Sequence, residues 1–224
     1  GLIVNQILEP GRPCIHNLGL AHVFDMRSAG AVTGGPENHL LARLGAELGR
    51  FYRLPSCSWV STEALVPDGQ AAIEKTAGFL SHFQAGVSLV WGVGQLESEL
   101  TVSPAQAVID NEIIGYARRM IRGIEITDET VALPVIREVG IAGHYLEHEH
   151  TMTHFRTELF EPSLLNRQRR ATWQEKGAPP LADLAWEKAR SLMNTPPQPG
   201  LDEDQSRELR KLEARFLGGH QSAS

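Results

Sequence analysis

The sequence has little of what marks several specialised protein classes. Only two of its 224 residues are cysteines, Cys14 and Cys57. They are too few for a disulfide framework or a thiolate zinc site, which predicts a reducing, cytoplasmic location. No apolar run reaches the roughly 18 residues of a membrane span, and no signal peptide is apparent. With 21 Lys and Arg against 27 Asp and Glu, the net charge is −6. Nucleic-acid binding requires clustered cations, so we expect neither nucleic acid nor membrane as a partner.

The residues that are present indicate a folded protein. The hydrophobic fraction of 42% excludes a disordered chain. The length of 224 residues suits one domain or a piece of a larger one. The first residue is Gly1 rather than Met, so we expect a processed or truncated start.

The first half of the chain alternates between predicted strands and helices. We expect a strand at 13–18, a glycine-rich loop at 28–36, a helix from Glu37, a strand at 56–61 and a helix after Asp68. The uncharged run at 87–93 predicts a strand buried on both faces. One apolar stripe should lie along the helix that starts at Glu37; it comprises Leu40, Leu41, Leu44, Leu48 and Phe51.

Helix-start and helix-stop signals are clearest further along. Ser103 followed by Pro104 is a cap signal that predicts a helix start. Thr127 should cap another helical stretch, and Pro134 should kink or split it. From about residue 144 we expect no more strands, and three or four helices follow. The small polar residues at 218–224 predict a disordered tail.

This alternation predicts an α/β fold, in which helices cover a parallel sheet. A complete (β/α)₈ barrel needs eight strands, and only three or four can be placed here. The chain is therefore either a small open-sheet protein or the C-terminal part of a barrel. We expect barrel residues at 1–140, a helical C-terminal extension at 141–217 and a tail at 218–224.

Polar residues gather where the predicted strands end. In parallel α/β folds active sites form outside these ends, so three consecutive connections should form the rim of one cavity. Helix capping is the alternative explanation for Glu37 and Asp68. The rim candidates are His16, Asn17, Asp25, Glu37, Ser61, Thr62, Glu63, Asp68, Gln95, Glu97 and Glu99.

Two further polar groups lie on predicted helices. His150 and His154 are four residues apart, a spacing that can hold zinc or iron and would suit a metal-dependent hydrolase or lyase. A solvated helix with ion pairs is the alternative, and without an HExxH pattern we expect no metal. Asp110 and Glu112 interrupt an apolar segment, so at least one should pair with a buried Arg or cap a neighbouring loop.

Several motifs together resemble the trimethylamine methyltransferase family. They are Gly35-Pro36-Glu37, Leu54-Pro55, Pro67-Asp68-Gly69-Gln70-Ala71 with Glu74, Ile109-Asp110-Asn111-Glu112, and His150-Thr151 with His154, Arg156 and Glu158. The resemblance covers about residues 1–216. It implies the C-terminal part of a TIM (β/α)₈ barrel followed by a helical extension, with the N-terminal half of the barrel missing.

The resemblance also implies an activity. Family members move a methyl group from a methylated amine to the cobalt of a corrinoid (cobalamin) carried by a separate protein. We therefore expect that corrinoid protein and a small methylated amine as partners, a homo-oligomer, and no metal bound by this chain. No pyrrolysine is present near 56–61, where the resemblance would place it. This favours a quaternary amine such as glycine betaine over trimethylamine.

Site roles follow from the same resemblance. A substrate cation should be held by carboxylates and aromatic faces, which makes Glu37, Glu63 and Asp68 the catalytic candidates. The expected substrate-binding residues are His16, Asn17, Asp25, Trp59, Ser61, Gln70, Trp91 and Gln95. Glu63 and Leu65 depart from the usual family pattern, which leaves the substrate open, and a non-catalytic paralogue is a further alternative.

Overall fold

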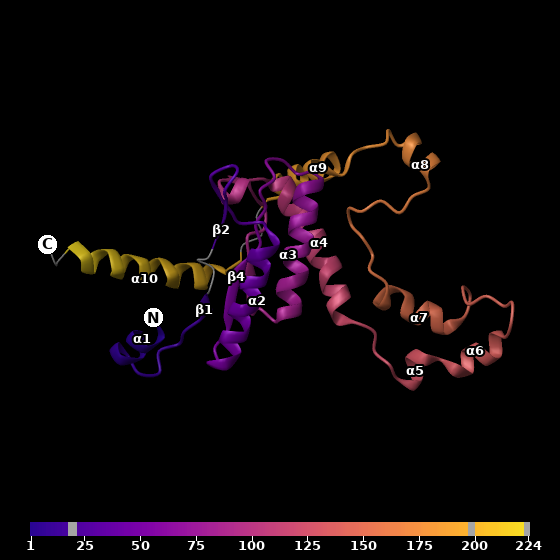
Figure 1. Cartoon of the computed structure of the whole chain (residues 1–224), viewed down its shortest axis with the longest axis horizontal. Helices are drawn as coiled ribbons and strands as arrows, with labels where there is room; N and C mark the ends of the chain where they lie inside the picture. Colours follow the sequence, from indigo (N-terminus) through magenta and orange to yellow (C-terminus); the bar gives the residue numbers. More distant parts are fainter. Residues whose placement is uncertain (18–21, 197–199, 222–224) are drawn as a thin grey trace. The chain divides into compact units, whose positions relative to one another are not determined.

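The computed structural model describes residues 1–17, 22–196 and 200–221 (Figure 1). The chain divides into two compact units, Gly1–Ala189 and Arg190–Ser224. The first unit contains every strand of the described residues and all the predicted rim residues. The predicted domain boundary near residue 140 remains a prediction.

The first unit contains a three-stranded parallel sheet. Its order is β1 (His16–Asn17), β4 (Ser56–Trp59) and β5 (Leu89–Trp91). His16 lies opposite Ser56, and Trp59 lies opposite Trp91. The α/β class and the parallel sheet are confirmed. The strand expected at 13–18 is only two residues long in the structure, and Leu18 lies outside the described residues.

Three long helices alternate with these strands. They are α2 (Pro36–Phe51), α3 (Gly69–Ala85) and α4 (Pro104–Arg122), which lie next to one another (Figure 1). Asp68 caps α3 by accepting hydrogen bonds from the Gln70 and Ala71 N–H groups at 2.9 and 3.1 Å. Ser103 caps α4 by accepting from the Gln106 N–H at 3.2 Å. The predicted helix starts are therefore confirmed.

Helix α2 packs through small residues rather than through its leucines. Its buried side comprises His39, Ala42, Gly45, Ala46 and Gly49. The predicted apolar stripe lies largely on the other side, where Leu40, Leu44 and Phe51 are 61%, 50% and 77% exposed. The predicted stripe is therefore not the side of α2 that packs, because α2 approaches its neighbours too closely for large side chains.

Close packing also explains a glycine in α3. A Cβ atom at Gly78 would lie 2.6 Å from Val60 Cγ1 and 3.0 Å from His39 Nε2. Glycine therefore allows α3 to lie directly against the end of β4 and against α2. Beside it, Val60, Phe79 and Ala117 form a core between sheet and helices.

Two sequence expectations about strands are wrong. The 87–93 run is not buried on both faces, since Leu89 is 55% and Trp91 44% exposed while Val90 packs into the core. The helices cover only one face of the sheet there. The loop expected at 28–36 contains β3 (Gly30–Val32), which pairs antiparallel with β2 (Val23–Asp25). A three-residue strand is too short to show alternation in the sequence.

A second hairpin follows β5. Strands β6 (Gln95–Leu96) and β7 (Thr101–Val102) pair antiparallel around the 3₁₀ turn Glu97–Glu99. Glu97, Ser98 and Glu99 have φ values of 52°, 51° and 77°. Three successive non-glycine residues in the left-handed region are strained, so surrounding contacts must hold this turn.

Shorter helices make up the rest of the first unit. They are α1 (Leu2–Leu8), α5 (Asp128–Val131), α6 (Leu133–Val139), α7 (Glu149–Glu158) and α8 (Arg170–Glu175). Thr127 caps α5, and α6 begins beside Pro134, so the predicted cap and split are confirmed. Helix α9 (Leu181–Met193) contributes Ala185 to a core with Ala105, Ile109 and Leu164.

The second unit contains α10 (Glu203–Gln221). This helix extends into the stretch expected to be a disordered tail, and residues 222–224 lie outside the described part of the chain. Among the described residues, no helix has the length and apolar character that a membrane crossing requires.

Candidate active site

One carboxylate links three strand–helix connections of the first unit. Glu63, which follows β4, accepts hydrogen bonds from the Thr33 and Gly34 N–H groups at 2.6 and 3.0 Å and from Thr33 Oγ1 at 3.0 Å. Its other oxygen accepts a hydrogen bond from the Ser98 hydroxyl. The chain after β3, after β4 and after β6 therefore meets at Glu63.

These contacts keep Glu63 negatively charged. Burial by itself would raise the pKa of Glu63, but the hydrogen bonds from Ser98, Thr33 and Gly34 outweigh it and hold the pKa below its usual value. The carboxylate therefore carries a fixed negative charge at neutral pH. Ser61 adds to this junction, because its buried hydroxyl accepts a hydrogen bond from Thr33 Oγ1 at 2.9 Å.

A second carboxylate, Glu74 of α3, binds the backbone next to Glu63. Its Oε2 accepts from Thr62 Oγ1 at 2.5 Å and from the Glu63 N–H at 2.8 Å. A Cβ atom at Gly34 would lie 2.7 Å from Thr62 Cα and 2.9 Å from Glu74 Oε2. The glycine-rich turn before α2 therefore allows direct contact between the two connections.

Aromatic rings lie on the face of the sheet that the three long helices leave open. The rings of Trp59 and Trp91, on neighbouring strands, have centroids 5.9 Å apart. His22 lies against Trp59 at 5.6 Å between centroids. Asn17 and Cys57 share this face by register with Trp59, because alternate residues and paired residues point to the same side.

A buried ion pair fixes the ends of β4 and β5 from the helix side. Lys75 Nζ lies 3.2 Å from Asp110 Oδ2, and both side chains are 0% exposed. Lys75 also donates to the Val60 and Gly92 carbonyls at 3.1 and 2.7 Å. Asp110 accepts from the Gly94 N–H at 2.7 Å. Burial lowers the pKa of Lys75 and raises that of Asp110, while their mutual attraction opposes both shifts.

Glu112 caps a distant loop. Its carboxylate accepts from the N–H groups of Ser163, Leu164 and Leu165 at 2.9, 3.1 and 3.2 Å. The prediction that at least one of Asp110 and Glu112 pairs with a buried Arg or caps a neighbouring loop is confirmed by Glu112. The cation that pairs with Asp110 is a lysine rather than the expected arginine.

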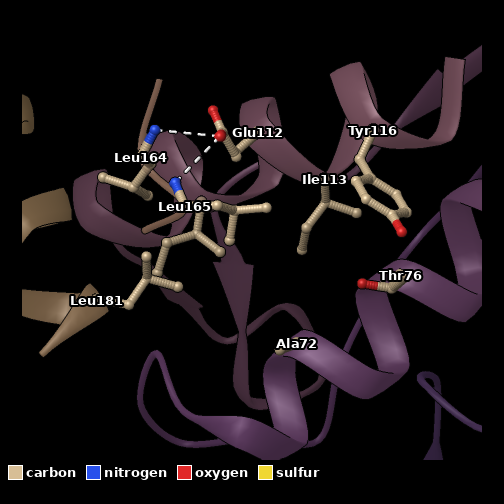
Figure 2. A pocket seen from close by; sticks show the side chains of 9 residues that line it. Ala72, Thr76, Glu112, Ile113, Tyr116, Leu164, Leu165 and Leu181 are labelled. Carbon is tan, nitrogen blue, oxygen red and sulfur yellow. Dashed lines mark hydrogen bonds between the residues drawn. The ribbon is translucent and has the colours of Figure 1, made fainter. Parts of the chain in front are cut away.

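One cavity of the first unit lies away from Glu63 and its partners. It has a volume of about 320 Å³ and is lined by α3, α4, the 164–165 segment and the start of α9 (Figure 2). Figure 2 shows Leu164, Leu165 and Leu181 on one side, with Ile113 and Tyr116 on α4. None of the predicted rim residues lines it. Its lining is mostly apolar, and the carboxylate that it contains, Glu112, is already bound by the Ser163, Leu164 and Leu165 N–H groups.

The remaining predicted residues make contacts other than those with Glu63. Asp25 binds the Arg27 N–H and the Ser28 hydroxyl within its own hairpin turn, and these bonds lower its pKa. Asp68 is the α3 cap, and Gln70 donates to Glu74 Oε1 at 3.0 Å. Glu37 is exposed on the first turn of α2. The capping explanation therefore fits Asp68 directly.

The other candidates differ in their surroundings. His16 lines a hollow beside α1 with Asn17, and its Nε2 atom is buried without a hydrogen-bond partner among the described residues. The Oε1 atom of Gln95, in β6, is also buried without a hydrogen-bond partner among the described residues. His150 and His154 lie on α7 and contact Glu129 of α5.

Sequence reasoning missed the residues that organise this region. Thr33, Ser98 and Lys75 were not among the candidates, although they bind Glu63 or join the strand ends. Lys75 did carry a signal, because a lysine within a helix that packs on a sheet must find a buried partner. Thr33 and Ser98 carried none, since their contacts to Glu63 span 30 and 35 residues of sequence.

The sequence model of the family described as trimethylamine methyltransferase (MTTB) matches residues 1–216. The chain belongs to the trimethylamine methyltransferase family. This confirms the resemblance carried by the Gly35-Pro36-Glu37 and Pro67-Asp68 motifs.

Relatives in this family have names that describe methyl transfer. The trimethylamine methyltransferase MttB of Desulfitobacterium hafniense (strain DSM 10664 / DCB-2) is 34% identical over 203 residues, which cover 88% of this chain and 40% of the relative. MttB2 of Methanosarcina mazei is 31% identical, over 95% of this chain and 43% of the relative. The glycine betaine methyltransferase of Desulfitobacterium hafniense (strain Y51) is 30% identical, over 79% of this chain and 37% of the relative. The chain thus spans about two fifths of the length of these relatives.

Proposed function

We propose that this chain is part of a methyltransferase that moves a methyl group from a quaternary amine to the cobalt of a corrinoid carried by a separate protein. Family membership supports methyl transfer, and the relatives' names include both trimethylamine and glycine betaine. Corrinoid dependence is the part that the proposal adds.

We further propose that the parallel sheet belongs to a (β/α)₈ barrel. Strands β1, β4 and β5 are parallel neighbours in chain order, as in such a barrel, and the helices between them pack on one face. The chain covers only part of each relative, so an N-terminal half would supply the other strands. The helical C-terminal extension would then cover one side of the barrel.

The observation that carries the substrate proposal is the pair of tryptophans at the ends of β4 and β5. Trp59 and Trp91 lie on the helix-free face with ring centroids 5.9 Å apart, and His22 adjoins Trp59. An indole face attracts a quaternary ammonium group through its quadrupole. In a barrel this face would point inward, where exclusion of water strengthens the attraction.

The carboxylates would supply the complementary charge. Glu63 stays ionised because its pKa is lowered, so it would contribute negative potential near the strand ends without binding a proton. Glu37 and Asp68 remain proposed as further carboxylates of the same rim, and Ser61 and Gln70 as polar contacts. His16, Asn17, Asp25 and Gln95 remain candidates to bind polar groups of the substrate.

The chemistry requires positioning rather than a protein nucleophile. As the methyl carbon leaves, the electron pair of its bond to nitrogen stays on nitrogen, which becomes a neutral tertiary amine. The corrinoid substrate supplies the electron pair for the new carbon–cobalt bond. The chain would hold the onium group by its tryptophans and align one methyl group with the acceptor.

The absence of pyrrolysine decides between the two amine classes in this proposal. Residues 56–61 read Ser-Cys-Ser-Trp-Val-Ser, with no pyrrolysine where the resemblance would place it. A quaternary amine is charged at every pH, so the tryptophan faces and the carboxylates would attract it, and its leaving group is already a neutral amine. The proposal therefore favours a quaternary substrate.

A methyl-transfer assay tests the proposal. The chain, combined with the N-terminal half and a cobalt(I) corrinoid protein, should form methylcobalt with glycine betaine or another quaternary amine. Trp59→Leu and Trp91→Leu should each raise KM by about tenfold, from the loss of roughly 1–2 kcal/mol of cation–π attraction. Phe51→Leu is the matched control, because Phe51 is 77% exposed on α2. Methylcobalt formation from none of the amines, or equal KM values for all three variants, would contradict the proposal.

A further inference from the structure

A second site for chemistry lies on the helices that follow the sheet. Helix α7 places His150 and His154 on one side, four residues apart, with ring centroids 4.3 Å apart. Both rings face Glu129 of α5. His154 Nε2 lies 3.1 Å from Glu129 Oε1, and His150 Nε2 lies 3.0 Å from the Glu129 carbonyl oxygen.

These three side chains match the requirements of a transition-metal site. One donor atom from each of Glu129, His150 and His154 lies within 4.8 Å of the other two. In a tetrahedral zinc site with bonds of about 2.0–2.1 Å, neighbouring ligand atoms are about 3.3 Å apart. The contact of 3.1 Å between His154 and Glu129 is already close to that value, so small side-chain rotations would complete the geometry.

The donor types select the class of ion. Two imidazole nitrogens and one carboxylate oxygen are a donor set of zinc, cobalt and related divalent ions, whereas calcium and magnesium prefer oxygen ligands throughout. The Glu129 side chain is 70% exposed and that of His154 is 28% exposed, which leaves room for an ion to enter and for water as a fourth ligand.

We propose that Glu129, His150 and His154 bind one divalent transition-metal ion, with zinc as the natural occupant. The ion would join α5 to α7. Helix α5 has only four residues, too few to be stable by itself, and it contains no buried residue. A neighbouring contact, in which His148 Nε2 lies 3.5 Å from Glu138 Oε2, joins α6 to the same end of α7. The metal would act on structure and does not depend on the proposed methyl transfer.

Titration with cobalt(II) tests the site directly, because its visible spectrum reports coordination by nitrogen and oxygen. Purified protein without an affinity tag, treated with a chelator and dialysed, should bind one Co²⁺ per chain and release it to Zn²⁺. His154→Gln and Glu129→Gln should each weaken binding at least about tenfold, because each removes one of three protein ligands. His144→Gln is the matched control, since this exposed histidine is outside the set.

A second readout separates the site from histidines elsewhere on the surface. Zn²⁺ should slow hydrogen exchange at residues 125–132 in the wild-type protein and in His144→Gln, but not in His154→Gln. Circular dichroism of each variant without metal would establish that it is folded. Absence of Co²⁺ binding, equal Co²⁺ affinity in the wild type and the His150→Gln/His154→Gln double variant, or exchange at 125–132 that does not respond to Zn²⁺ would overturn the proposal.

Discussion

His82 should make the stability of the protein fall as the solution becomes mildly acidic. This histidine of α3 is 1% exposed. Its Nδ1 lies 2.7 Å from the Gly78 carbonyl and its Nε2 lies 3.0 Å from Ser58 Oγ. The first contact needs a proton on Nδ1, and the second then uses Nε2 as an acceptor from the Ser58 hydroxyl. The native state therefore holds a neutral ring, and burial is the main cause that lowers its pKa to about 4.

The sign and size follow from linkage. The pKa is about 4 in the native state and 6.5 in the unfolded chain, so the unfolded state binds more protons between these values. The neutral His82 ring contributes its full share of the unfolding free energy above pH 6.5. This share is lost progressively as the pH falls towards 4. At 1.36 kcal/mol per pKa unit, the loss is about 2 kcal/mol at pH 5 and about 3 kcal/mol below pH 4. Burial also lowers the pKa of neighbouring His39, which adds a loss of the same sign.

The assay is chemical denaturation at pH 8 and pH 5 for the wild type and His82→Gln. Glutamine does not titrate, so the decrease in unfolding free energy between the two pH values should be smaller in the variant by about 2 kcal/mol. His144→Gln, at an exposed position, should retain the full wild-type decrease. The pKa values of Glu63 and Glu112 are lowered, so their effect on stability falls mainly at lower pH. They therefore do not affect the comparison of pH 8 with pH 5. Equal decreases in wild type and His82→Gln would refute the reasoning.

Three other substitutions probe buried contacts of the first unit. Lys75→Met should lower the unfolding free energy by about 3–5 kcal/mol because it leaves buried Asp110 unpaired, and adding Asp110→Leu should cost less than the two single changes together. Glu112→Ala should cost about 2–3 kcal/mol and accelerate hydrogen exchange at 163–165, whose N–H groups lose their acceptor. Gly34→Ala should cost about 1–3 kcal/mol in thermal or chemical denaturation, because its Cβ would lie 2.7 Å from a backbone atom.

Each of these substitutions has a matched control. Gly69→Ala introduces the same methyl group where no atom lies within 4 Å. Lys176→Met and Glu147→Ala change the same residue types at exposed positions. Equal effects of test and control substitutions would show that the contacts described above do not determine stability. If the losses of unfolding free energy from Lys75→Met and Asp110→Leu simply add in the double variant, the two charges are not coupled.

Local signals predicted the element order well. Ser103 with Pro104, Asp68 before α3, and Pro134 each act on the backbone within a few residues, so the sequence alone indicates where helices begin or end. The acids at 110 and 112 were also informative, because a charge within an apolar helix must find a partner.

The packing of helix faces and the contacts between distant residues were harder to predict. The leucines of α2 indicate an amphipathic helix, but small residues on its other side decide which face packs. The rim residues were sought at strand ends, but the sequence could not show that Glu63 would bind Thr33 and Ser98 while Asp25 would bind its own turn. Such contacts depend on loop paths, which have no periodic pattern.

The outer edges of the small sheet have a practical consequence. Among the described residues, β1 and β5 each pair with β4 on one side only. Their outer backbone groups can therefore template another extended segment. In a longer polypeptide that capacity would recruit further strands of the same sheet, whereas in a separately produced piece it would favour self-association. Expression together with the proposed N-terminal half should therefore give material that self-associates less than these 224 residues expressed by themselves.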